Sequence, residues 1–217
     1  MAQFNLGNMY ERGVGVAEND AEAVKWYRKA ADQKNADAQY NLGNMYERGV
    51  GVPENDAEAV KWFRKAADQG LAHAQFNLGI MYERGVGVAE NDAEAVNWYR
   101  KAADQGLGEA QANLGALYHK GDGVPQNDAE AVKWYRKAAD QGVEMAQFNL
   151  GNMYLTGRGV PQDSISGYVW WSMAKTQGDT YAELKLDKLK AYLTKQQIAK
   201  AKTLATKCYE SDYKDCD

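Results

Sequence analysis

The same residues return every 36 positions along this 217-residue chain, and that period constrains the fold more than any other feature. Residues 2–37 and 38–73 differ at only six of their 36 positions. A fixed period of this length indicates supersecondary units that bury a continuous core by stacking on one another. The strictest columns are a leucine, an interior glycine and a tryptophan: Leu6, Leu42, Leu78, Leu114 and Leu150; Gly7, Gly43, Gly79, Gly115 and Gly151; Trp26, Trp62, Trp98, Trp134 and Trp170. We therefore predict five repeats, 2–37, 38–73, 74–109, 110–145 and 146–181, followed by C-terminal capping helices and a tail at 182–217.

Each repeat has the apolar pattern of two helices. In the second repeat, Leu42 and Met45 share one helical face, and Gly49 is placed to end that helix in the left-handed conformation. Asp56 is a favourable N-cap for a second helix, which Gly70 then ends. No segment alternates polar and apolar residues long enough to predict a strand. We predict an all-α protein, a right-handed α/α superhelical solenoid of antiparallel helix pairs.

The interior glycine of each first helix predicts a close helix contact. A glycine such as Gly43 costs a helix about 0.5–1 kcal/mol relative to alanine. Repeating that cost five times indicates that a neighbouring helix passes too close for a Cβ. The tryptophan column, exemplified by Trp62, is expected to fill the space between the second helix and the following repeat.

The repeat pattern Ala-x3-Leu-Gly-x2-Tyr-x2-Gly-x-Gly-Val, followed by Asp, Ala, Trp and Ala-Ala at fixed offsets, resembles the Sel-one-like repeat. The resemblance covers residues 2–181 in five copies, and the segment Tyr168-Val169-Trp170-Trp171-Ser172 is similar to the terminal cap of bacterial members. It implies a tetratricopeptide-type helical solenoid that acts as a protein-binding scaffold or adaptor. One branch of the family staples its helix pairs with cysteines, which the repeats of this chain lack.

The last 36 residues depart from the repeat. They carry eight lysines against six acidic residues, and Thr194 with Gln197 predicts a capping box that opens a final amphipathic helix. Cys208 and Cys216 are the only cysteines. Cys208 is either a buried apolar residue or half of a disulfide with Cys216. A disulfide would favour a periplasmic or secreted location, and its absence a cytoplasmic one.

Composition excludes several classes of function. The net charge of −4 and a pI near 5.4 offer no large basic surface for nucleic acid. No apolar run approaches the ~18–20 residues of a membrane span. Because the first residues lead straight into the repeat, we expect no signal peptide. Residue 2 already belongs to a helix face, so we expect that the sequence begins inside a longer protein or that this uncapped repeat pairs with another chain. The chain is thus expected to be a monomer or a weak homodimer, with no cofactor.

The inventory of catalytic residues is small. His73 and His119, the only histidines, lie in different repeats and have no metal-ligand spacing. Ser172 and Lys175 match the S-x-x-K motif of serine β-lactamases, but the accompanying motifs are missing. We predict a protein that is not an enzyme. A β-lactam-binding or hydrolysing enzyme of the kind found among cysteine-rich relatives stays an alternative, and so does an idealised repeat protein without a natural ligand.

Partner binding is predicted on the concave face, which the first helices line. Asn41 and its counterparts never vary, and their amides either bind a peptide backbone or bond to the main chain of the neighbouring repeat. The aromatic column beside them is either part of this binding face or simply part of the core between helices. Ala112 and Ala116 are small side chains at two adjacent positions, which could open a pocket between Phe76 and Phe148. The candidate residues are Tyr40, Asn44, Glu47, Arg48, His73, Phe76, Ile80, Glu83, Arg84, Ala112, His119, Lys120, Phe148 and Asn152.

Overall fold

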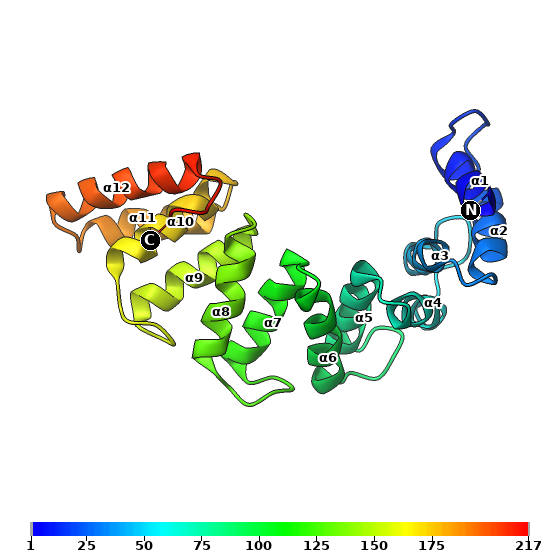
Figure 1. The fold of residues 1–217 in the computed structure, drawn as a ribbon, viewed down its shortest axis with the longest axis horizontal. Coiled ribbons are helices and arrows are strands. Elements are labelled where there is room, and N and C mark those ends of the chain that lie inside the picture. The colour runs from blue at the N-terminus through cyan, green and yellow to red at the C-terminus, as the bar shows by residue number, and fades with distance from the viewer. Residues whose placement is uncertain (1, 217) are drawn as a thin grey trace. The chain divides into compact units, whose positions relative to one another are not determined.

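The protein is an all-α solenoid of paired helices, seen here in a computed structural model that describes residues 2–216 (Figure 1). That range contains twelve helices and no strand. Helices α1 to α6 belong to one compact unit, Met1–Gln105, and α7 to α12 to a second, Gly106–Asp217. The helices are α1 (Ala2–Arg12), α2 (Asp20–Ala31), α3 (Ala36–Arg48), α4 (Asp56–Asp68), α5 (Ala72–Arg84), α6 (Asp92–Asp104), α7 (Gly108–Lys120), α8 (Asp128–Ala139), α9 (Glu144–Thr156), α10 (Ser164–Thr176), α11 (Thr180–Lys190) and α12 (Lys195–Glu210).

Each repeat is a pair in which an odd-numbered helix packs against the next even-numbered one, as predicted. We call α1, α3, α5, α7 and α9 the A helices, and α2, α4, α6, α8 and α10 the B helices. Within each unit, a B helix also packs against the A helix of the following repeat, as α4 does against α5 and α8 against α9. The apolar core is therefore continuous from one repeat to the next inside a unit.

The helix ends explain part of the repeated sequence and correct one prediction. The A helix α3 ends at Gly49, which has φ +65° as expected. The backbone N–H of Gly49 donates to the carbonyl of Met45. The N-cap of α4 is Asn55 and not Asp56, because the Asn55 side chain accepts a hydrogen bond from the backbone N–H of Glu58 at 3.0 Å. Asp56 is instead the first helical residue, where its negative charge interacts favourably with the positive end of the helix dipole and stabilises the helix.

The interior glycines make room for an aromatic ring. A Cβ added to Gly43 would lie 2.6 Å from the ring of Phe63, which is fully buried in the B helix of the same repeat. The same relation joins Gly79 to Tyr99. The close approach predicted from sequence is therefore confirmed, and the group that approaches is a side chain of the partner helix rather than its backbone.

Buried glutamines at one column, a feature not expected from the sequence, tie three helices together in the second, third and fifth repeats. Gln39 is 4% exposed, and its side-chain N–H donates to the carbonyl of Ala31 at the end of the preceding B helix at 3.0 Å. Its Oε1 accepts a hydrogen bond from Gln69, at the end of its own B helix, at 2.6 Å. Gln75 makes the equivalent bonds to Ala67 and Gln105. Because these polar groups are buried, the hydrogen bonds fix how neighbouring repeats dock.

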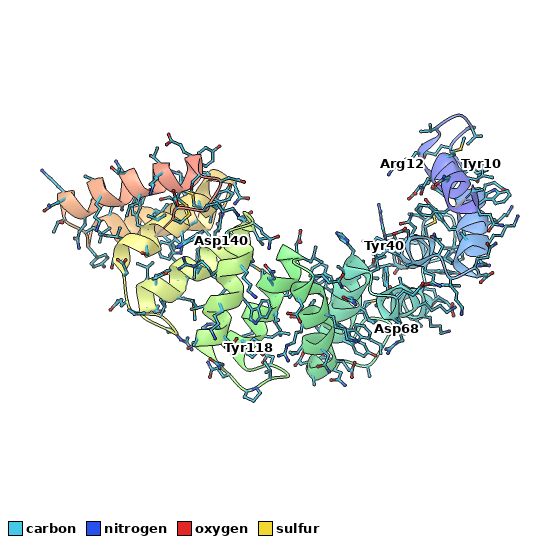
Figure 2. The ribbon with its side chains drawn as sticks, viewed as in Figure 1. Tyr10, Arg12, Tyr40, Asp68, Tyr118 and Asp140 are labelled. Carbon is cyan, nitrogen blue, oxygen red and sulfur yellow. A yellow bond between two sulfur atoms is a disulfide. The ribbon has the colours of Figure 1, made fainter. Side chains whose placement is uncertain are left out.

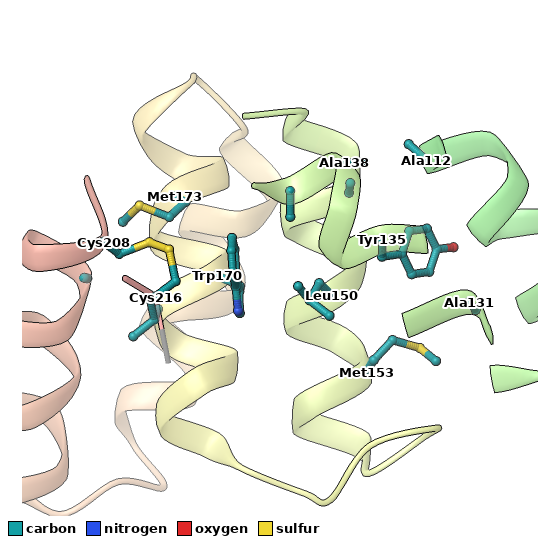
Figure 3. Close-up of a cluster of buried hydrophobic side chains, with 14 residues drawn as sticks. Ala112, Ala131, Tyr135, Ala138, Leu150, Met153, Trp170, Met173, Cys208 and Cys216 are labelled. Atoms are coloured by element: carbon teal, nitrogen blue, oxygen red, sulfur yellow. A yellow bond between two sulfur atoms is a disulfide. The ribbon is translucent and has the colours of Figure 1, made fainter. Parts of the chain in front are cut away.

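The C-terminal helices close the stack. α11 and α12 both pack against α10, and Thr194 and Gln197 form the predicted capping box at the start of α12. Cys208 of α12 is bonded to Cys216 of the tail, and both residues are buried beside Trp170 in one apolar cluster (Figure 3). Lys214 donates to the carbonyl of Asp140 at 2.8 Å, which holds the tail against the end of α8.

Reduction of this disulfide should loosen the tail. Cys208 and Cys216 close a short loop, so the chain-entropy estimate of its stabilisation is about 2–3 kcal/mol. We expect dithiothreitol to lower the urea midpoint of the wild type and to leave a Cys208→Ser/Cys216→Ser variant unaffected. Both thiols should resist iodoacetamide until the protein is reduced, as mass spectrometry would show. Alkylation of the folded, unreduced protein would contradict the bond.

Candidate functional site

The predicted binding residues fall on the A helices of both units. Tyr40, Asn44, Glu47 and Arg48 belong to α3 (Figure 2), and His73, Phe76, Ile80, Glu83 and Arg84 belong to α5. Ala112, His119 and Lys120 lie on α7, and Phe148 and Asn152 on α9. Ala112 is buried, and each of the other residues is either half-buried or exposed. We refer to this surface, unit by unit, as the A-helix face.

Ala112 departs from the predicted role. Its side chain is fully buried in the cluster that contains Ala131 and Tyr135, so it cannot contact a partner. We therefore leave Ala112 out of the candidate site.

The aromatic column serves partly as packing and partly as surface. The ring of Tyr40 lies 5.8 Å from Phe63 of the B helix and 6.3 Å from His73 of the next A helix. Phe76 lies 5.7 Å from Tyr99 in the same way. Phe148 stacks on Trp171 at 5.9 Å. All three column residues stay half-buried, so each rests on the core and keeps part of its ring accessible.

The asparagine column bonds to side chains of neighbouring repeats. Asn77 donates to the Oδ1 of Asn44 at 3.4 Å, which joins α5 to α3. Asn41 hydrogen-bonds to the hydroxyl of Tyr27 in the preceding repeat. These bonds favour a structural role, although the acceptors are side chains rather than the main chain considered from sequence.

Below the asparagines, a tyrosine and a glutamate pair across the two helices of a repeat. The hydroxyl of Tyr27 donates to Glu11 at 2.5 Å, and that of Tyr99 donates to Glu83 at 2.6 Å. Burial, followed by the bond to Glu11, raises the pKa of the Tyr27 hydroxyl far above its usual range. The tyrosine therefore stays a neutral donor to the carboxylate.

The second repeat lacks this donor. Phe63 replaces the tyrosine, and Glu47 has no hydrogen-bond partner among the described residues. Burial, with a smaller effect of the nearby Asp56 carboxylate, raises the pKa of Glu47, while Arg48 and Arg84 oppose the rise. Glu47 is thus a half-buried acceptor that is available to a partner.

Phe63→Tyr should supply the missing donor. A hydrogen bond to a carboxylate contributes about 1–2 kcal/mol, so we expect a gain of that size in the free energy of unfolding at pH 7. The bond favours ionised Glu47 and lowers its pKa, so the gain should be present above the unfolded-state pKa and shrink as the pH falls below about 4. Urea denaturation at pH 7 and pH 3 would measure it. Tyr99→Phe, the reverse change at a paired site, should lose a similar amount; equal stabilities of all three proteins would contradict this account.

In the fourth repeat an ionic cluster takes the place of this pair, completed by an arginine from the fifth repeat. Nδ1 of His119 lies 2.6 Å from one carboxylate oxygen of Asp128, and Nε of Arg158 donates to the other oxygen at 3.0 Å. Burial raises the pKa of Asp128, but the two hydrogen bonds together hold it below its usual value. His119 is therefore half-buried and paired, rather than a merely exposed polar residue. The signal in the sequence was that His119 and Arg158 both break their columns.

The serine and the lysine of the S-x-x-K motif are not arranged as a nucleophile and its base. The hydroxyl of Ser172 donates to the carbonyl of Tyr168 at 2.8 Å, and Lys175 forms an ion pair with Glu183 at 2.8 Å. An activated serine needs a base within hydrogen-bond reach of its hydroxyl.

Nowhere in residues 2–216 do three metal-ligating side chains gather into a possible metal site. Over the same range, no helix combines the length and apolar composition that a membrane crossing needs.

The fold and the repeated A-helix face define a helical-repeat solenoid, and comparison with known proteins gives its family. The Sel1 repeat matches five times in succession, at residues 1–35, 36–71, 72–107, 108–143 and 144–179. The chain therefore belongs to the Sel1-repeat family. Proteins of this family are commonly protein-interaction scaffolds.

Two solved structures of bacterial proteins are similar over most of the chain. The crystal structure of a protective antigen of uropathogenic Escherichia coli strains, which displays an SLR fold, is 41% identical with a TM-score of 0.86, and the match covers 92% of this chain and 43% of that one. A Sel1 repeat protein from Oxalobacter formigenes is 39% identical with a TM-score of 0.79, over 85% of this chain and 74% of that one.

A curated relative matches a single repeat. It is a sel1-like repeat-containing protein, L18, of Acanthamoeba polyphaga mimivirus, 54% identical over 35 residues, or 16% of this chain and 6% of its own length. The chain thus spans less than half of the Escherichia coli antigen and a small part of the viral protein.

Proposed function

We propose that this protein is a non-enzymatic scaffold that binds another protein or a peptide along the A-helix face. The observation that carries the proposal is the partial burial of Tyr40, Phe76 and Phe148. Framework residues of the same helices, such as Leu42 and Leu78, are fully buried, so the repeat does not need these rings to be accessible. Partly accessible aromatic side chains on a rigid support are well suited to anchor a partner.

The acceptor Glu47 and the exposed Arg48 and Arg84 complete this surface in the first unit. They supply hydrogen-bonding groups around the aromatic anchors, as the rim of an interface usually does. The arrangement favours an extended peptide or a protein edge that contacts successive A helices. The fixed register of the repeats, set by the buried glutamines, keeps these groups preorganised.

A peptide selection tests the proposal. Random dodecapeptides displayed on phage would be selected on the wild type and then measured on a Tyr40→Ala/Phe76→Ala/Phe148→Ala variant. We expect the selected peptides to lose at least tenfold in affinity on this variant. A Lys61→Ala/Lys133→Ala variant, changed at exposed positions of the B helices, should bind them normally. Equal binding to all three proteins would refute an A-helix site.

A further inference from the structure

In the fifth repeat, apolar residues occupy the two positions at which the first and third repeats have a glutamate and a tyrosine. Leu155 stands where the earlier repeats have glutamate or histidine, Trp171 stands in the tyrosine position, and Gly167 replaces an alanine. A Cβ on Gly167 would lie 2.5 Å from Cγ of Leu155, so the glycine is what admits the leucine. The indole N–H of Trp171 donates to the carbonyl of Phe148 at 3.2 Å, which fixes the ring. The three changes fit one another and form an apolar floor.

A pocket of about 340 Å³ lies over this floor, between the end of α9, the start of α10 and the face of α11. Helix α10 packs against both α9 and α11 in the second unit (Figure 1). Lys185, Lys188 and Leu189 line the other side from one face of α11, together with Tyr192, which follows that helix. Tyr192 is 86% exposed, more than any other large hydrophobic side chain in residues 2–216. The volume is within the range of sites that take a small group or a side chain.

The lysines of the pocket have no carboxylate partner among the described residues. The acidic residues of α11 pair elsewhere: Asp187 with Lys190, and Glu183 with Lys175, each at 2.8 Å. Asp163, the acidic residue before α10, accepts hydrogen bonds from Ile165 and Ser166. Lys185 lies only over the ring of Tyr181, 5.1 Å from its centroid. The pocket therefore combines an apolar floor with two uncompensated positive charges.

From this charge complementarity we infer that the pocket binds an acidic peptide segment of a partner protein, with an apolar side chain on Leu155 and Trp171 and flanking carboxylates on Lys185 and Lys188. This site deepens the proposed function and rests on it, because it gives the chemistry of the partner at the α9 end of the A-helix face. An apolar side chain beside carboxylates satisfies both parts of the pocket. A basic segment would be repelled by the two lysines.

The test uses the full chain and a phage library of random dodecapeptides. Selected peptides should carry at least two Asp or Glu residues within three positions of Leu, Phe or Trp. Their affinity should fall at least tenfold on Lys185→Glu/Lys188→Glu and by a smaller factor on Tyr192→Ser. A Lys195→Glu/Lys200→Glu variant, with the same charge change at exposed positions of α12, should bind normally. Unchanged circular dichroism would confirm that every variant is folded.

The outcomes separate this inference from the proposed function. Peptides that bind the Lys185→Glu/Lys188→Glu variant normally but lose affinity on Tyr40→Ala/Phe76→Ala overturn the pocket and leave the A-helix face standing. Peptides that are insensitive to both variants, or a library that yields no binder, overturn both. Two further results also overturn the acidic-peptide assignment: self-association of the chain that the pocket variant abolishes, and charge-dependent binding to phosphatidylserine vesicles by a protein that selects no acidic peptide.

Discussion

Gly51→Ala is expected to cost about 3 kcal/mol or more of folding free energy, a large loss for removing no contact. Gly51 has φ +69°, a conformation in which a non-glycine residue costs about 1–2 kcal/mol. A Cβ at this position would also lie 2.5 Å from the carbonyl oxygen and 2.6 Å from the carbonyl carbon of Asp20, the first residue of α2. Because both atoms are backbone, no rotamer change relieves the clash, and the loop must move away from the preceding repeat.

Gly70→Ala separates these two causes. Gly70 also has positive φ, +90°, but a Cβ there would meet nothing within 4 Å. We expect it to lose only the conformational part, about 1 kcal/mol, partly offset by the lower entropy of the unfolded chain. Urea denaturation followed by far-ultraviolet circular dichroism would measure both. Losses of equal size would mean that the loop of one repeat does not rest on the preceding B helix.

The sequence predicted the helix pairs, their approximate ends and the capping box because these features depend on neighbouring residues. It was wrong about the N-cap of α4, where Asn55 and Asp56 are adjacent and both are good caps, so that only the backbone conformation distinguishes them. It also missed Gln39. A glutamine usually indicates an exposed position, and only the docking of three helices buries it with hydrogen bonds at both its side-chain nitrogen and its side-chain oxygen.

The candidate site was predictable as a set of columns but not as a set of contacts. The changes at Phe63, Glu47 and their counterparts can be read from the sequence. Which of these side chains contact each other depends on how the A and B helices cross. The same is true of Leu155 and Gly167, which lie twelve positions apart and meet only in the folded repeat. Ala112 shows the opposite error, since a small residue in a variable column was interpreted as an opening when it fills the core.

Trp170→Ala is the second change with a large expected effect, about 3–5 kcal/mol. Trp170 is fully buried in the cluster formed with Leu150, Met173 and the disulfide (Figure 3), so removing its ring leaves a cavity beneath α12. The cavity cannot collapse easily, because Cys208 is bonded to Cys216 directly above it. Urea denaturation would measure the loss.

Trp134 is the matched control in the same unit, because it occupies the same column one repeat earlier but is only half-buried. Nζ of Lys137 lies 4.1 Å from the centroid of its ring, at the protein surface. Trp170 is covered by α12 and the tail, whereas Trp134 is only half-buried, so Trp134→Ala should cost about 1–2 kcal/mol. Trp170→Phe, which keeps most of the ring, should fall between them. If Trp134→Ala and Trp170→Ala cost the same, the tryptophan column acts uniformly, and the C-terminal cap does not stabilise the last repeat by covering Trp170.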